Sequence, residues 1–299
     1  MNEKYLTNKI KESAMHILFS VCALASIISV IIICVFIFAN GVPAIKEIGL
    51  FDFLLGKSWR PAHEEYGILP MIVGSIYVTA GAIIIGVPLG LLCAVFMARF
   101  CPKWLYKFIK PLFELMAGIP SIVYGFFGIV VLDPIVRNVF GGSGKGILTE
   151  SILLGIMILP TLVSVIESAL RAVPSSYYEG ALALGATHER SVFCTIVPAA
   201  KSGILAGVIL GIGRAIGETM AVVMVAGNQS IMPETITSGI RTLTANIVLE
   251  MAYATDLHED ALIATAAVLF VFILLINTSF SLVTRERKDR TNKKRSGVV

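Results

Sequence analysis

Long runs of apolar residues, separated by shorter polar segments, dominate the chain. Three runs carry no charged residue, at 17–39, 68–98 and 261–284. Each one exceeds the roughly 20 apolar residues that a helix needs to cross the hydrocarbon core of a bilayer. Two shorter charge-free runs follow the same pattern, at 115–132 and 151–166. The pattern predicts an all-α membrane protein with several spanning helices.

Composition supports this class and excludes others. Apolar residues make up 56% of the chain and charged residues only 15%, against about 25% charged in an ordinary soluble domain. Soluble enzymes and nucleic-acid-binding domains are therefore excluded. The five cysteines show no CxxC spacing and no accompanying histidine cluster. We expect no metal site, no disulfide framework and no cofactor.

A sixth span is predicted at 202–233, which is apolar except for Arg214 and Glu218. Lys and Arg concentrate in the cytoplasmic loops of membrane proteins. With six spans and the N-terminus inside, most of the 24 Lys and Arg residues fall on the cytoplasmic side. Removing one doubtful span would place the basic tail, 285–299, outside. We therefore predict six transmembrane helices with cytoplasmic N- and C-termini.

Two polar segments between the spans carry further expectations. Lys103, Lys107 and Lys110 recur at helical spacing within 102–117, with apolar residues between them, which is typical of a helix on the cytoplasmic membrane surface. The outer stretch 228–260 is acidic and too long for a simple turn. We expect it to contain short helices and either to meet a partner or to form a solvated lid.

The cytoplasmic segment 174–198 carries the most specific motif. It reads EGALALGA from Glu179 and ends in Thr-Ile-Val-Pro at Pro198. This resembles the EAA loop of binding-protein-dependent ABC importer permeases, E-A-A-x-x-x-G followed by I-x-L-P. Gly180, Thr195 and Val197 depart from that pattern with small or compact residues. The resemblance implies an ATPase-docking loop formed by Glu179, Gly180, Ala181, Gly185 and Pro198, whereas the alternative is an ordinary helical hairpin.

Two further stretches narrow the resemblance. The sequences AGIPSIVYGF from residue 117 and GIGRAIGETMAV from residue 211 are similar to permeases of phosphate ABC importers, of the PstC type. The resemblance covers roughly residues 66–284. It implies a type I ABC importer permease fold at 67–284, preceded by an N-terminal tail, extra helix and external segment at 1–66. It also implies a PstA-type sister permease, separate ATPase subunits, an external phosphate-binding protein and a bacterial or archaeal cytoplasmic membrane.

The two charges inside the predicted span at 202–233 are the candidate transport residues. Arg214 and Glu218 stand four residues apart and would share one face of a continuous helix, together with Gly203, Gly207 and Gly211. The Arg214 guanidinium would bind phosphate oxygens, because its planar fork suits an oxyanion. Glu218 would neutralise Arg214 or accept a hydrogen bond from a protonated phosphate oxygen. The alternative is a structural ion pair without ligand contact.

Other polar residues are weaker candidates. The hydroxyls of Ser121, Tyr124 and Thr219 would line the phosphate path or bond neighbouring helices. Glu167 and Arg171, also four residues apart, are interpreted as a surface pair. The glycine-rich stretch 141–146 lacks the glycine and hydroxyl positions of a Walker A loop, so it is interpreted as a turn.

The predicted function is a non-catalytic permease subunit that imports inorganic phosphate. Alternatives are a permease for sulfate or molybdate and, from another class, a secondary transporter. An intramembrane enzyme is disfavoured, because the spans hold no HExxH helix and no nucleophile with a base.

Overall fold

The computed structural model describes the backbone of residues 2–296 and the side chains of residues 12 and 14–279. The first helices are α1 (Asn2–Ile48), α2 (Leu50–Leu55), α3 (Leu69–Val95), α4 (Lys103–Gly118), α5 (Ser121–Phe127), α6 (Asp133–Phe140) and α7 (Ile147–Arg171). They are followed by α8 (Ser175–Ala183), α9 (His188–Ser191), α10 (Val197–Ala199), α11 (Lys201–Gly217), α12 (Met220–Val225), α13 (Leu243–Glu250) and α14 (Asp256–Ser296).

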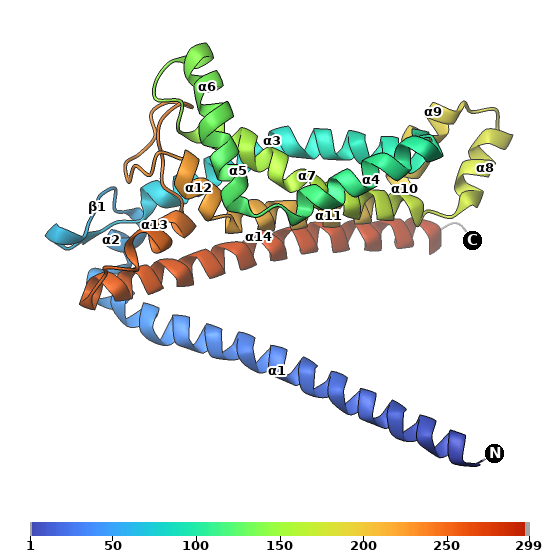
Figure 1. Ribbon diagram of the computed structural model, residues 1–299, viewed down its shortest axis with the longest axis horizontal. Helices are drawn as coiled ribbons and strands as arrows, with labels where there is room; N and C mark the ends of the chain where they lie inside the picture. The colour runs from blue at the N-terminus through green and yellow to red at the C-terminus, as the bar shows by residue number, and fades with distance from the viewer. Residues whose placement is uncertain (1, 297–299) are drawn as a thin grey trace.

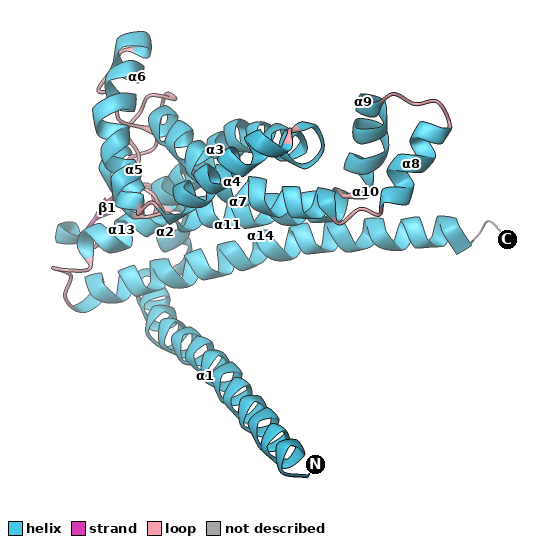
Figure 2. Ribbon diagram, turned by 45° about the vertical axis from the view of Figure 1, so that its right-hand side comes forward, coloured by secondary structure: helices cyan, strands magenta, loops and turns pink. Residues whose placement is uncertain are grey.

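Short elements of other kinds join or extend these helices. A 3-10 turn, η1 (Pro61–His63), sits between two strands, β1 (Trp59–Arg60) and β2 (Glu65–Tyr66), which pair antiparallel. Three π-helical turns are η2 (Phe96–Phe100), η3 (Gly128–Leu132) and η4 (Val192–Ile196). The remaining described residues form loops and turns, which Figure 2 shows in pink between the cyan helices.

Five helical segments are long and apolar enough to cross a membrane, and a bent pair supplies a sixth. The expected six-span, all-α architecture is thus confirmed. The third span runs over Ser121–Phe140, so the predicted boundaries at 115–132 are wrong. Pro120 lies in an extended conformation and separates α4 from α5, because proline supplies no backbone N–H and disfavours helix in the residue before it.

Helix α7 lies at the centre of the bundle, packed against α3 on one side and α11 on another. It is the most deeply buried of the candidate spans. Small residues allow α3 and α7 to approach closely: a Cβ atom on Gly86 would lie 2.8 Å from the carbonyl oxygen of Gly155. Large side chains fill the remaining space, and fully buried ones on α7 recur every four residues at Leu154, Ile158, Leu162, Ile166 and Leu170.

A second, smaller hydrophobic core lies where α2, β1 and β2 pack against α13 and the start of α14. The buried carboxylate of Glu250 on α13 accepts hydrogen bonds from Trp59 Nε1 on β1 at 2.7 Å and from Arg241, and it also lies 2.9 Å from His258 Nε2. The expected short helix in 228–260 is confirmed by α13. Glu250 differs from a solvated acidic residue, because it is only 7% exposed and holds three separate segments together.

Helix α1 diverges from the rest of the molecule (Figures 1 and 2). It contacts α14 near its C-terminal end, where a Cβ atom on Gly41 would lie 3.0 Å from the Cα atom of Ala264. In Figure 1 the free end of α1, the far end of α14 and the α8–α9 loop all lie at the same end of the molecule. The cytoplasmic placement of that end stays a prediction.

Candidate functional site

The candidate site centres on a break in the fifth span. Helix α11 ends at Gly217, Glu218 is extended (φ −68°, ψ 137°), and α12 begins at Met220. The prediction of one continuous helix over 202–233 is therefore wrong. Gly213 and Gly217 weaken the helix before the break, because glycine has the lowest helix propensity after proline. Thr244 fixes the break from outside the helix, since its hydroxyl donates to the Glu218 carbonyl at 2.9 Å.

Arg214 lies in the last turn of α11, where the negative end of the helix dipole stabilises a cation. Its Nη1 atom donates to Thr161 Oγ1 on α7 at 2.9 Å. No ion pair joins Arg214 to Glu218 within the part of the chain that the structure describes. The expected pairing on one helix face is corrected: the helix stops before Glu218, whose Oε1 instead accepts the N–H of Ala221 at 3.5 Å.

Helix α5 brings two more of the predicted path residues to the break, because α5 packs against α12. Tyr124 is 7% exposed, and its hydroxyl donates to the Met116 carbonyl at 2.9 Å. Arg214 lies near enough for its charge to act on Tyr124. Ser121 is half-buried in the first turn of α5. Thr219 Oγ1 donates to the Gly217 carbonyl at 3.2 Å.

The glycine face of α11 turns toward protein, as its spacing predicts. A Cβ atom on Gly207 would lie 2.9 Å from Ile166 Cγ1, and one on Gly211 would lie 3.1 Å from Leu162 Cδ2, both on α7. Gly203 faces Ala169 in the same way. Arg214 continues this face to Thr161. The guanidinium therefore enters the seam between α11 and α7 and does not face lipid.

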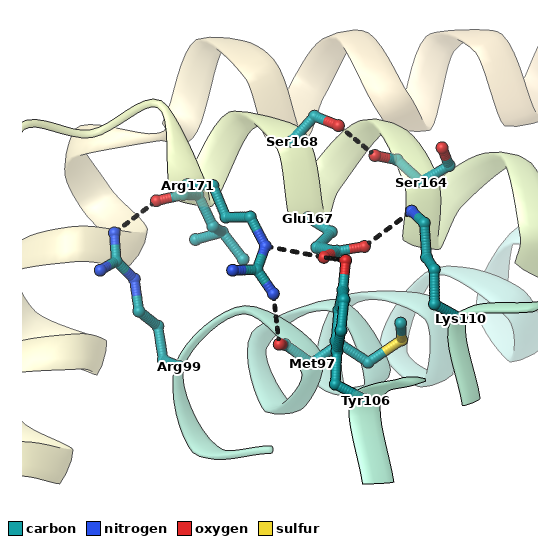
Figure 3. Close-up of polar contacts among 9 residues, drawn as sticks. Met97, Arg99, Tyr106, Lys110, Ser164, Glu167, Ser168 and Arg171 are labelled. Atoms are coloured by element: carbon teal, nitrogen blue, oxygen red, sulfur yellow. Dashed lines mark hydrogen bonds and ion pairs between the residues drawn. The ribbon is translucent and has the colours of Figure 1, made fainter. Parts of the chain in front are cut away.

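Near the C-terminal end of α7, Glu167 is the centre of a cluster of polar side chains (Figure 3). Its carboxylate accepts hydrogen bonds from Tyr106 Oη at 2.7 Å, Lys110 Nζ at 3.0 Å and Arg171 Nε at 2.7 Å. The side chain is 2% exposed, so the interpretation as a surface pair is wrong. The hydrogen bond to Glu167 is the main cause that raises the pKa of Tyr106, a residue of α4. The cluster fastens α4 to α7.

Arginines bridge the same region through backbone carbonyls. Arg171 Nη2 donates to the Met97 carbonyl at 2.9 Å, and Arg99 Nη2 donates to the Leu170 carbonyl at 2.6 Å (Figure 3). Both acceptors belong to residues near helix C-terminal ends, whose last carbonyls lack partners within the helix. The ends of α3 and α7 are thereby held together next to the α8–α9 loop.

The predicted docking residues lie along the segment from α8 to α10: Glu179, Gly180 and Ala181 on α8, Gly185 in the α8–α9 loop, and Pro198 in α10. Glu179, Gly180 and Pro198 are exposed, and Ala181 is half-buried. Gly185 has φ +82°, a backbone conformation that favours glycine, and forms a sharp turn after α8. The loop is braced from within, because Tyr178 Oη lies 2.8 Å from His188 Nδ1 and the His188 ring packs edge-on against Phe100 at 4.7 Å.

Two residues near the break are absent from the sequence-based predictions. Thr161 follows Pro160 inside a span. A threonine hydroxyl in a span does not indicate a functional site unless its hydrogen-bond partner is known. Glu150 lies one position before the charge-free run at 151–166, so it falls outside the run that predicts the span. In the structure it belongs to the first turn of α7 and is 0% exposed. A boundary placed one turn earlier would have revealed it.

Comparisons with known proteins agree with this architecture. The sequence profile of the binding-protein-dependent transport system inner membrane component family matches residues 86–288. A probable ABC transporter permease protein, YqgH of Bacillus subtilis, is 38% identical, with 85% of this chain and 86% of the relative covered. The phosphate transport system permease protein PstC of Mesorhizobium japonicum is 36% identical, with 80% of each chain covered.

Solved structures share the fold. A chain of the MetNI methionine ABC transporter in an inward-facing conformation has a TM-score of 0.59 at 18% identity and covers 77% of this chain and 99% of its own. A chain of a bacterial alginate ABC transporter has a TM-score of 0.63 at 15% identity and covers 92% of this chain and 96% of its own. Together with the sequence matches, these likenesses establish that the chain belongs to the family of inner membrane components of binding-protein-dependent transport systems.

Proposed function

We propose that this chain is the transmembrane permease subunit of an ABC importer for inorganic phosphate, powered by separate ATPase subunits. The observation that carries the proposal is the placement of Arg214 at the interrupted end of α11, inside the bundle. A half-buried guanidinium at a helix break offers a planar set of N–H donors to a tetrahedral oxyanion. Relatives named as phosphate transport permeases support phosphate as that oxyanion.

The path residues form two groups in this proposal. Arg214, Glu218 and Thr219 lie at the break, and Ser121 and Tyr124 lie on α5 beside α12. One Arg214 nitrogen already binds Thr161, which orients the guanidinium and leaves its other N–H groups for the anion. Tyr124 acts as a positioning residue, because its hydroxyl is used by the Met116 carbonyl. Ser121 and Thr219 provide hydroxyls near the helix ends.

The partners follow from the surfaces of the chain. An exposed helix, α8, followed by a glycine turn is suited to insertion into a groove of an ATPase subunit, so Glu179, Gly180, Ala181, Gly185 and Pro198 form the proposed docking loop. A homologous permease, of the PstA type, would complete the translocation path. An external phosphate-binding protein would deliver the anion to the opposite side.

The test is phosphate uptake into proteoliposomes that contain this chain with its sister permease, ATPase subunits and binding protein. We expect ATP-dependent uptake that excess sulfate does not inhibit and that Arg214→Gln abolishes while the complex still assembles. Arg137→Gln, which changes an exposed arginine on α6, is the matched control. Undiminished uptake by the Arg214→Gln complex would show that Arg214 has a structural role and does not bind phosphate. Uptake of sulfate or molybdate in place of phosphate would overturn the substrate.

A further inference from the structure

A tight cavity, without room for a water molecule, lies between α3, α7 and the α11–α12 break, and two carboxyl side chains line it. Glu150 enters from the first turn of α7, and Glu218 enters from the break. Hydroxyls of Ser75, Thr79 and Thr242 complete the polar part of the lining, and the rest is apolar. The cavity therefore brings Glu150, to which the proposed function gives no role, next to the proposed path residue Glu218.

Glu150 has no stabilising partner there. The side chain is 0% exposed, and neither carboxyl oxygen has a hydrogen-bond partner among the described residues. The lining contains no lysine, arginine or histidine. The two arginines next to lining residues in sequence are engaged elsewhere, Arg214 with Thr161 and Arg241 with Glu250. An ionised carboxylate in such surroundings is far less stable than the neutral acid.

The helix N-terminus does not supply the missing donors. A carboxylate in the first turn is normally stabilised by free backbone N–H groups. In α7, Ile147 N–H donates to the Ser238 carbonyl at 3.2 Å and Leu148 N–H to the Ile236 carbonyl at 3.0 Å. Carbonyls of the 228–260 stretch therefore occupy the donors that an anionic Glu150 would need.

Glu218 is in the opposite situation. Its side chain is half-buried, and Oε1 accepts the Ala221 N–H at 3.5 Å. Glu150 and Glu218 line the same cavity. Two carboxylates in one site disfavour simultaneous ionisation, and the more solvated member keeps the charge. The elements around the cavity present no other titratable group to Glu150, since α3, α11, α12 and Thr242 contribute hydroxyls and apolar side chains to the lining.

We propose that the Glu150–Glu218 pair binds one proton, held on Glu150, which limits the break to a single carboxylate charge. The proton comes from water and returns to water, and no other bond changes. Loss of that proton would place a second negative charge behind Glu218 and repel an oxyanion approaching Arg214. Glu150 is thus a residue that sets the charge of the path without touching the substrate. This part of the inference rests on the proposed phosphate transport.

Infrared spectroscopy tests the proton without reference to transport. The assembled complex at neutral pH should show a carboxylic acid C=O band that Glu150→Gln removes. The matched control, Glu114→Gln, changes an exposed carboxyl on α4 and should leave the band intact. An identical band in the wild type and Glu150→Gln would show that Glu150 is ionised and would overturn the proposal.

The pH profile of uptake tests the consequence. The ratio of Glu150→Gln to wild-type uptake cancels the titration of phosphate itself, because both proteins meet the same substrate. We expect this ratio to rise by about tenfold across the alkaline limb of the wild-type profile, and Glu150→Asp to follow the wild type. A flat ratio would overturn the link to transport. Loss of the band in a complex that imports no phosphate would support the protonated Glu150 and overturn the proposed substrate instead.

Discussion

Arg214 of α11 donates to the hydroxyl of Thr161 on α7 at 2.9 Å, although a carboxylate, Glu218, stands four residues further along the chain. The neutral partner leaves the guanidinium without an ion pair among the residues whose side chains the structure describes. An uncompensated cation inside the bundle attracts an anion more strongly than a closed ion pair would. The proposed binding of an anion by Arg214 depends on this charge.

Arg214→Lys should reduce phosphate uptake by about tenfold or more, because the ammonium retains the charge and loses the planar fork. Uptake by the reconstituted complex measures the loss. Arg137→Lys, on the exposed surface of α6, should transport as the wild type does. Normal uptake by Arg214→Lys would contradict bidentate binding of the anion.

Thr161→Val should raise the KM for phosphate with little change in the stability of the protein. The substitution preserves side-chain volume and removes the hydroxyl that orients Arg214. Steady-state uptake at varied phosphate concentration separates KM from the maximal rate. An unchanged KM would mean that the 2.9 Å contact does not position the guanidinium for binding.

Glu167→Gln should destabilise the chain by about 2–3 kcal/mol, since it leaves Lys110 and Arg171 without their shared anion. The midpoint of thermal denaturation in detergent measures this effect, and Glu114→Gln is the exposed control on α4. A variant as stable as the wild type would indicate that the α4–α7 contact depends on apolar packing alone.

Gly207→Val should destabilise the chain by about 1–3 kcal/mol, because its Cβ would lie 2.9 Å from Ile166 Cγ1 and force α11 away from α7. Gly213→Val on the same helix is the matched control, since a Cβ atom there meets nothing within 4 Å. Equal thermal midpoints for the two variants of the isolated chain would argue against close packing at Gly207.

Gly185→Ala should weaken association with the ATPase subunits while the chain itself still folds. An alanine at φ +82° is strained by about 1 kcal/mol, so the α8–α9 turn would rearrange. Pull-down of the ATPase by the assembled permease measures the effect. Gly141→Ala, which introduces the same strain at φ +78° after helix α6 and outside the docking loop, should bind normally. Full binding of the ATPase by Gly185→Ala would show that docking does not depend on the conformation of this turn.

The sequence predicts the spans well, because about 20 apolar residues in a row have few alternatives to crossing a bilayer. The glycine face of α11 and the turn at Gly185 also follow from local rules. The contacts of Arg214 do not, because helical periodicity assumes an unbroken helix and the break at Glu218 depends on Thr244, a residue of another segment. The burial of Glu167 is equally hidden from the sequence: Tyr106 and Lys110 lie about 60 positions away and come together only in the fold.

The side chains of helix α1 are less constrained by packing than those of the other spans. No side chain of its most apolar stretch is fully buried, although Phe38 packs edge-on against Phe270 of α14, so few neighbours among the described residues limit its side chains. Exchange of one aliphatic residue for another there should leave the free energy of unfolding nearly unchanged, whereas the same exchange on α7 would create a cavity or a clash. Over that stretch, the bilayer constrains hydrophobicity and length but not the order of the aliphatic residues.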